Sequence, residues 1–160
     1  MLSQTTEYAL RAMCTLAYSP DRLVSTADLA GVSKVPMNYL AKVLQLLSRA
    51  GLVTGRRGVG GGYKLARDAG EITLLEVINA IDPIERIHAC PLGLENHAGA
   101  LCPLHRRLDD ASRTLIEMFE GVTLLDILTE SGANRPLCDE HMTSRVEVTL
   151  GAVKPHAEGS

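Results

Sequence analysis

The sequence predicts a mainly α-helical fold with one small β-hairpin and a long additional helix. Apolar residues recur at three- and four-residue spacing in several segments, which is typical of amphipathic helices packed around a core. A stretch rich in glycine and arginine lies between two short apolar runs, as expected of a hairpin. A further apolar series at heptad-like spacing follows much later in the chain, which favours a separate association helix.

The first two helices are expected to be short. Apolar spacing predicts a helix over residues 4–18, and Pro20 marks its end. Ser25 and Asp28 form a pattern like a capping box ahead of the second helix, which we expect Gly31 to terminate. A tight turn then leads to Pro36, a residue suited to the first position of the next helix.

The third predicted helix, PMNYLAKVLQLLSRAG, has the most regular pattern in the chain. Its buried stripe is expected to consist of Leu40, Val43, Leu44 and Leu47. Its opposite face is polar and carries groups able to meet base edges and phosphates. A solvated helix face produces the same pattern, so this face alone does not establish a ligand.

The segment LVTGRRGVGGGYKLARD predicts two short strands, 52–54 and 63–65, joined by a flexible arginine-bearing loop. Its glycines invite comparison with phosphate-binding loops. The spacing excludes both known types, because each requires glycine where Tyr63 stands and a P-loop also requires Ser or Thr in place of Leu65. The segment also leads into a strand, so no helix N-terminus follows to hold a phosphate.

The order of helix, helix-turn-helix and basic hairpin is that of a winged helix-turn-helix, whose third helix enters the DNA major groove. Residues 1–70 carry nine Lys and Arg against four Asp and Glu, a net charge of +5, whereas the remaining residues carry seven against fifteen. This asymmetry fits double-stranded DNA as the partner of the first half. The expected DNA-contacting residues are Asn38, Tyr39, Lys42, Gln45, Arg49, Arg56, Arg57 and Lys64.

The second half of the chain begins with another helix, which Thr73 and Glu76 cap and Pro83 follows. A long helix then carries a heptad-like seam, which could pack within a monomer but favours a homodimer that reads two half-sites. The seam consists of Leu104, Leu108, Ala111, Leu115, Met118 and Val122. Gly121, Thr123 and Asp126 indicate a break before a short last helix.

These elements divide the chain into four parts. Residues 1–82 form the winged helix-turn-helix, 83–103 a loop, 104–131 the dimerisation helix with the short terminal helix, and 132–160 a tail without periodicity that is a candidate for disorder. The N-terminus lacks the features of a signal peptide, and no run approaches the ~18 apolar residues of a membrane helix. We therefore expect a soluble cytoplasmic protein with no membrane partner.

The loop region HACPLGLENHAGALCPLH, residues 88–105, contains two cysteines and three histidines. Two thiols among prolines and glycines are not typical of buried packing, so we expect Cys90 and Cys102 to be functional. A cluster site, a thiol/disulfide pair and a tetrahedral zinc site all use these residue types. Cys14 is expected to be a small buried hydrophobic residue, and Cys138 with His141 forms an isolated Cys-x-x-His pair in the tail.

The chain resembles the Rrf-two family of bacterial winged-helix transcriptional regulators, of the IscR, NsrR and RirA types, from about residue 4 to residue 128. The resemblance lies in TEYALRAMCTLA, NYLAKVLQLLSRAGLV, GRRGVGGGYKLARD, ITLLEVINAID and the cysteine-bearing loop before a long helix. It implies a DNA-binding regulator, a repressor that acts as a homodimer and senses redox, nitric oxide or iron status through an iron–sulfur cluster.

The resemblance also implies a set of cluster ligands. Cys90 and Cys102 match the first and last of the three cysteines that cluster-binding members place in this loop, whereas the middle cysteine is missing. His97 lies near that missing position, His105 matches a ligand histidine, and Glu7 matches an acidic residue that serves as a ligand across the dimer in some members. The cluster would be 2Fe–2S or 4Fe–4S.

Two alternatives stay open at this point. A cluster-free regulator would use Cys90 and Cys102 as a thiol/disulfide switch, or these two residues with His97 and His105 as a zinc site. Glu7 in the first turn of a helix is favoured by the helix dipole whatever its function. No set of nucleophile, base and orienting group is visible in the sequence, so an enzyme is not expected.

Overall fold

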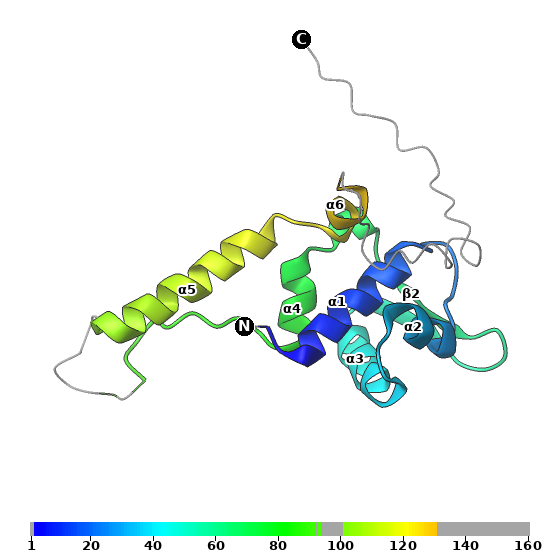
Figure 1. The fold of residues 1–160 in the computed structure, drawn as a ribbon, viewed down its shortest axis with the longest axis horizontal. Helices are drawn as coiled ribbons and strands as arrows, with labels where there is room; N and C mark the ends of the chain where they lie inside the picture. The colour runs from blue at the N-terminus through cyan, green and yellow to red at the C-terminus, as the bar shows by residue number, and fades with distance from the viewer. Residues whose placement is uncertain (1, 92, 94–100, 131–160) are drawn as a thin grey trace, which may run out of the picture.

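The computed structural model describes residues 2–91, 93 and 101–130. In this part of the chain the fold is mainly helical, with a two-stranded antiparallel hairpin, as the sequence predicts (Figure 1). The elements, in chain order, are α1 (Gln4–Ala17), α2 (Thr26–Ser33), α3 (Met37–Arg49), β1 (Val53–Arg56), β2 (Gly62–Leu65), the 3-10 turn η1 (Ala69–Glu71), α4 (Leu74–Ile81), α5 (Pro103–Glu120) and α6 (Leu124–Thr129).

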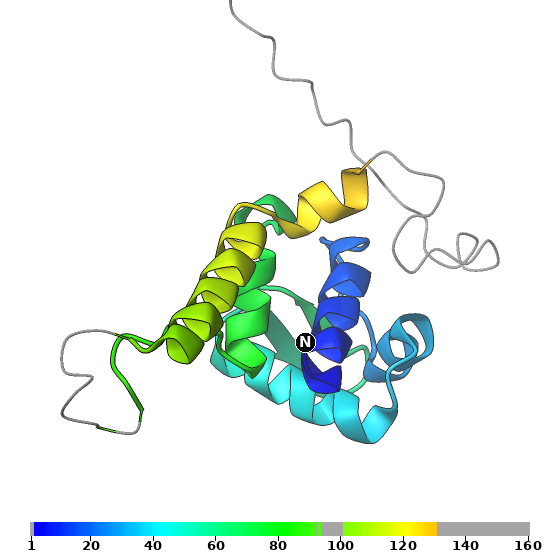
Figure 2. The same ribbon diagram turned by 60° about the vertical axis from the view of Figure 1, so that its left-hand side comes forward.

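Helix α1 lies at the centre of the winged-helix part and packs against α2, α3, α4, α6 and β2 (Figures 1 and 2). Its N-terminus is capped by Ser3, whose side chain accepts a hydrogen bond from the Thr6 backbone N–H. Ala9, Ala12 and Met13 are fully buried. Small side chains let neighbouring helices approach α1 closely, so several elements share one core.

Helix α2 does not end at Gly31, where the sequence pattern predicts its end. It continues to Ser33 and ends at Lys34, which has a left-handed conformation with φ of 54°. The Arg11 side chain from α1 donates hydrogen bonds to the carbonyls of Ser33 at 3.2 Å and Lys34 at 3.4 Å. These bonds satisfy carbonyls that a helix end leaves unpaired, and Leu29 and Ser33 are buried. Both contacts stabilise the last turn of α2, so the helix continues past Gly31.

Helix α3 buries the four apolar residues that the sequence predicts, Leu40, Val43, Leu44 and Leu47. Pro36 caps this helix and does not occupy its first turn, a shift of one residue. The helix ends beside Gly51, whose φ is +72°, a conformation that glycine adopts without steric cost. The buried stripe fixes the rotation of α3, so its polar face points away from the core.

Strands β1 and β2 pair antiparallel, from Val53 opposite Leu65 to Arg56 opposite Gly62. Tyr63 also exchanges two backbone hydrogen bonds of 2.8 Å with Val24, which attaches the hairpin to the segment before α2. A Cβ atom at Gly62 would lie 2.3 Å from the Val24 carbonyl oxygen. Glycine is therefore required at Gly62 for this close approach.

The cap predicted for α4 is confirmed, because Thr73 and Glu76 form a reciprocal capping box. Thr123 and Asp126 form a second one ahead of α6. Val122, expected at the end of the long helix, lies beyond α5. Its carbonyl accepts a hydrogen bond of 2.8 Å from the Leu74 N–H, so pairing with the start of α4 draws this residue out of the helix.

Helix α5 extends away from the winged-helix part, with its N-terminal end outermost (Figures 1 and 2). It contacts α4, yet none of its described residues is buried. Cys102 is its N-cap residue and Pro103 begins its first turn. Proline has no backbone N–H, but at this position a backbone N–H would have no partner within the helix, so no hydrogen bond is lost.

Candidate DNA-binding face and sensor site

The eight side chains expected to contact DNA are all exposed. Five lie on α3 and three on the hairpin: Asn38, Tyr39, Lys42, Gln45 and Arg49, and Arg56, Arg57 and Lys64. On α3 the polar members follow at intervals of four, three and four residues, opposite the buried stripe. The described residues of α3 include no acidic side chain. The face therefore presents hydrogen-bonding groups and positive charge to one side of the molecule.

Two open hollows flank the hairpin, and Arg56 lines both of them. One, of about 490 Å³, lies between the hairpin loop and the α2–α3 side and is also lined by Thr26, Ser48 and Arg57. The other, of about 600 Å³, lies on the Lys64 side of the hairpin. The sequence patterns did not indicate Thr26 or Ser48, which line the first hollow because α2 and α3 fold next to the hairpin.

The Arg11 side chain connects α1 to the recognition face. It lies 5.2 Å from the centre of the Tyr8 ring, and Tyr8 meets Tyr39 edge to face with ring centres 5.7 Å apart. Arg11 also binds both carboxylate oxygens of Glu7, at 2.7 and 2.6 Å. This hydrogen bond to Glu7 raises the pKa of Arg11. Within this chain, both carboxylate oxygens of Glu7 are therefore paired with Arg11.

Cys90, Cys102 and His105 come together at the outer end of α5. The Cys102 Sγ atom lies 3.3 Å from Nδ1 of His105, and Cys90 Sγ lies 4.0 Å from the same nitrogen. All three residues are half-buried. The structure therefore joins three of the five predicted metal ligands. His97, like Cys138 and His141, lies outside the described residues, so its position is not assigned.

Two thiols and an imidazole are donors of the type that iron–sulfur clusters and zinc take. Among the described residues, however, no group of three or more His, Cys, Asp and Glu side chains is arranged to hold a metal ion. The donor types fit an iron–sulfur cluster or zinc, but both Sγ atoms lie against one and the same atom, Nδ1 of His105. Cys14 is buried as expected, and this burial raises the pKa of its thiol to about 11.

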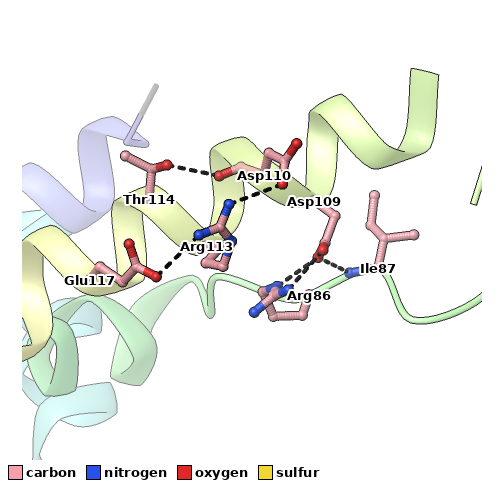
Figure 3. A network of polar contacts seen from close by, with 7 residues as sticks. All are labelled: Arg86, Ile87, Asp109, Asp110, Arg113, Thr114 and Glu117. Atoms are coloured by element: carbon pink, nitrogen blue, oxygen red, sulfur yellow. Dashed lines mark hydrogen bonds and ion pairs between the residues drawn. The ribbon is translucent and has the colours of Figure 1, made fainter. Parts of the chain in front are cut away.

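A polar network beside this site was missed in the sequence (Figure 3). Asp109 of α5 accepts hydrogen bonds from the Arg86 side chain at 2.6 and 2.7 Å and from the Ile87 backbone N–H at 2.9 Å. The Arg86 hydrogen bond holds the pKa of Asp109 at about 2, below its ordinary value. One signal was available in the sequence, because Asp109 follows His105 by one helical turn and so shares its face.

Comparison with known proteins identifies the family. A family model, Rrf2, described as an iron-dependent transcriptional regulator, matches residues 2–130. The chain belongs to this family. A relative from Aquifex aeolicus, named "Putative HTH-type transcriptional regulator", is 31% identical over 131 residues, which are 80% of this chain and 91% of the relative.

Solved structures of Rrf2-type regulators have the same fold. CymR, the global cysteine regulator of B. subtilis, matches with a TM-score of 0.67 and 26% identity over 82% of this chain and 98% of its own. IscR of T. potens matches with a TM-score of 0.67 and 23% identity over 82% and 88%. The oxidized form of Staphylococcus aureus CymR matches with a TM-score of 0.64 and 24% identity over 83% and 99%.

The chain is therefore a DNA-binding transcriptional regulator with a winged helix-turn-helix fold, and not an enzyme. Both the predicted family and the predicted fold class are confirmed. In the part of the Rrf2 chain that the structure describes, no helix is long and apolar enough to cross a membrane.

Proposed function

We propose that this regulator is a repressor that senses redox, nitric oxide or iron status through an iron–sulfur cluster in the loop between Cys90 and Cys102. The observation that carries the proposal is the convergence of these two thiols with His105 at the start of α5. The description of the family as iron-dependent supports it. A protein bound across a promoter in the cytoplasm excludes the polymerase, which is the simplest route to repression.

Cys90, Cys102 and His105 would hold the cluster, and His97 or Glu7 of a second copy would supply a further ligand. Thiolates are soft ligands that suit iron in either a 2Fe–2S or a 4Fe–4S cluster. When bound, such a cluster supplies a centre that reacts with oxidants and nitric oxide. Within this chain, Glu7 binds Arg11, so a role as ligand requires that ion pair to open.

We assign double-stranded DNA to the face formed by α3 and the hairpin. In this assignment Asn38, Lys42 and Gln45 meet base edges in the major groove, and the wing residues Arg56 and Arg57 meet the backbone or the minor groove. The exposure of all eight predicted side chains supports it. The two hollows beside Arg56 offer room for phosphate groups next to positive charge.

We further propose a homodimer formed through α5. Leu104, Leu108 and Met118 are 64, 49 and 60% exposed, and they repeat at heptad-like spacing. An apolar seam of this kind on a projecting helix is stabilised when a second copy covers it. Two copies would also present two recognition helices to two half-sites. In this arrangement the DNA-binding part is residues 1–82, the sensor loop is residues 83–103, and the dimer forms through residues 104–131.

A cluster-free switch is the second candidate, and one contact favours it. The Sγ atoms of Cys102 and Cys90 lie 3.3 and 4.0 Å from the same atom, Nδ1 of His105, so the two thiols that a disulfide would join share one neighbour. One solved structure with this fold is the oxidized form of Staphylococcus aureus CymR. A zinc site formed by the same loop is the other cluster-free possibility.

One experiment separates these candidates. The full chain is purified without oxygen, and its visible spectrum, iron content and acid-labile sulfide are measured before and after reconstitution. A cluster gives visible absorption together with matched iron and sulfide, and Cys90→Ser and Cys102→Ser abolish both. A colourless and iron-free protein after reconstitution would exclude the cluster, and zinc analysis together with thiol counting would then distinguish the two cluster-free mechanisms.

A further inference from the structure

Asp109 of α5 binds the segment that leads into the sensor loop. Its carboxylate accepts three hydrogen bonds, two from the Arg86 side chain and one from the Ile87 backbone N–H (Figure 3). The Asp109 side chain is only 14% exposed and that of Arg86 is 33% exposed. A bidentate ion pair with an added backbone bond is among the stronger polar contacts that a protein forms. We call these three residues the Asp109 clamp.

The clamp and the thiol site share one face of α5. Cys102, His105 and Asp109 follow at spacings of three and four residues, which places them one above the other on a helix. From Asp109 back to Cys102 the helix rises roughly 10 Å. Ile87 and Cys90 are three residues apart, and three residues of chain can span at most roughly the same length. Two contacts, one at each end, therefore set the incoming segment along the helix in a single register.

We propose that Asp109 is a positioning residue for the sensor site, which acts through Arg86 and Ile87 to hold Cys90 beside His105 and Cys102. The inference rests on the proposed sensor function of this loop and explains how its first thiol is placed. Without the clamp, the segment that carries Cys90 would lose the three hydrogen bonds that attach Arg86 and Ile87 to α5. The two thiols would then meet less often, because loss of these fixed contacts lowers the effective concentration of the Cys90 thiol at Cys102.

The neighbouring Asp110 offers a matched control. It lies in the same helix and carries the same charge, but it pairs with Arg113 at 3.1 Å. Arg113 also contacts Glu117, at 3.5 Å, so this second network runs along α5. These side chains are 44 to 60% exposed. Asp110→Ala therefore removes a carboxylate from α5 while leaving the described contacts of Arg86 and Ile87 in place.

The test measures how fast Cys90 and Cys102 form a disulfide in the full-length, metal-free and fully reduced chain. Diamide is the oxidant: two thiols lose two protons and two electrons, and the N=N bond of diamide is reduced to a hydrazine. Peptide mapping identifies the product, and buried Cys14 is an internal reference. We expect Asp109→Ala to slow this step roughly fivefold, the size of an ordinary coupling between neighbouring side chains, and Asp110→Ala to change it less than about twofold.

Two further variants show whether Asp109 acts through the clamp. Arg86→Gln should slow disulfide formation, and adding it to Asp109→Ala should produce little further loss, because the two residues act as one unit. Asp109→Glu keeps a carboxylate and should recover most of the wild-type rate. Circular dichroism should show an unchanged winged-helix melting transition in every variant, because the clamp lies outside the core formed around α1.

Several results would overturn the inference. They are a wild-type chain that forms no Cys90–Cys102 disulfide, equal slowing by Asp109→Ala and Asp110→Ala, and fully multiplicative effects of Asp109→Ala and Arg86→Gln. None of these measurements requires iron, sulfide or DNA. A chain that binds no cluster can still show the slowing by Asp109→Ala, and a chain that binds a cluster can still show no slowing. The cluster proposal and the clamp proposal can therefore fail separately.

Discussion

The winged-helix part and helix α5 use apolar residues in different ways. Around α1 the large side chains are almost fully buried, as Met13, Leu29 and Leu44 show with exposures of 0, 0 and 1%. On α5, Leu104 and Met118 are 64 and 60% exposed. The first region thus has its own core within one chain, whereas Leu104, Leu108 and Met118 of the α5 seam are exposed in the described chain. The buried core of the fold lies in the first region, and the proposed association and sensing lie in the second.

The polar residues show the same contrast. Arg56, Arg57 and Lys64 on the wing are exposed, and no ion pair of theirs occurs among the described residues. On α5, Asp109 and Arg113 are engaged in ion pairs. Cations without a carboxylate partner are available for phosphate, whereas paired charges hold local geometry. The four predictions that follow test this contrast in order of expected effect.

The largest effect is expected in the core. Leu44→Ala should lower the free energy of unfolding of the winged-helix part by about 2–5 kcal/mol, because it removes buried methyl groups and leaves a cavity. Val59 at the wing tip is fully exposed, and Val59→Ala should change stability by less than about 0.5 kcal/mol. Urea unfolding followed by circular dichroism measures both, and similar losses would show that the core is not where the structure places it.

The second prediction concerns the seam of α5. Leu108→Glu places a charge at the proposed dimer interface and should weaken association by about 3 kcal/mol or more, because the charge would be buried without a partner. Sedimentation or light scattering should then report a monomer with unchanged helix content. Thr114→Glu adds the same side chain outside the seam and should leave the dimer intact; dissociation by both variants would argue against this interface.

DNA affinity provides the third prediction. Arg56→Ala and Lys42→Ala should each weaken binding to a cognate promoter fragment by about 1–3 kcal/mol, and removing a cation that binds phosphate should lower the salt slope by about one. Arg113→Ala, which removes a cation from α5, should leave both quantities nearly unchanged. Equal effects of all three variants in fluorescence anisotropy would mean that net charge, and not the α3 and wing face, governs binding.

The smallest effect concerns acid pH. Because its pKa is lowered from 3.8 to about 2, Asp109 stabilises the folded chain above about pH 4, and this contribution is lost as the pH falls towards 2. An NMR titration of the Asp109 carboxyl carbon should show the low midpoint. Arg86→Gln should raise that midpoint towards 3.8; an unchanged midpoint would mean that Arg86 is not the cause.

Much of the fold follows from local patterns. The stripe of Leu40, Val43, Leu44 and Leu47 and the capping box of Thr73 with Glu76 depend on residues three or four apart, so the sequence predicts them directly. The same patterns misplaced the end of α2, because Arg11 caps it from 22 residues away. They also misplaced Val122, which leaves α5 to pair with Leu74.

The sequence by itself determined the helices, the wing, the polar face of α3 and the loop that carries Cys90 and Cys102, because periodicity, caps and glycine-rich turns act over a few residues. Only the tertiary structure decided that Cys90 lies beside His105 and that Asp109 binds Arg86, 23 residues earlier in the chain. The physical reason is that such contacts depend on how two separate segments pack together, and neither segment specifies that arrangement on its own.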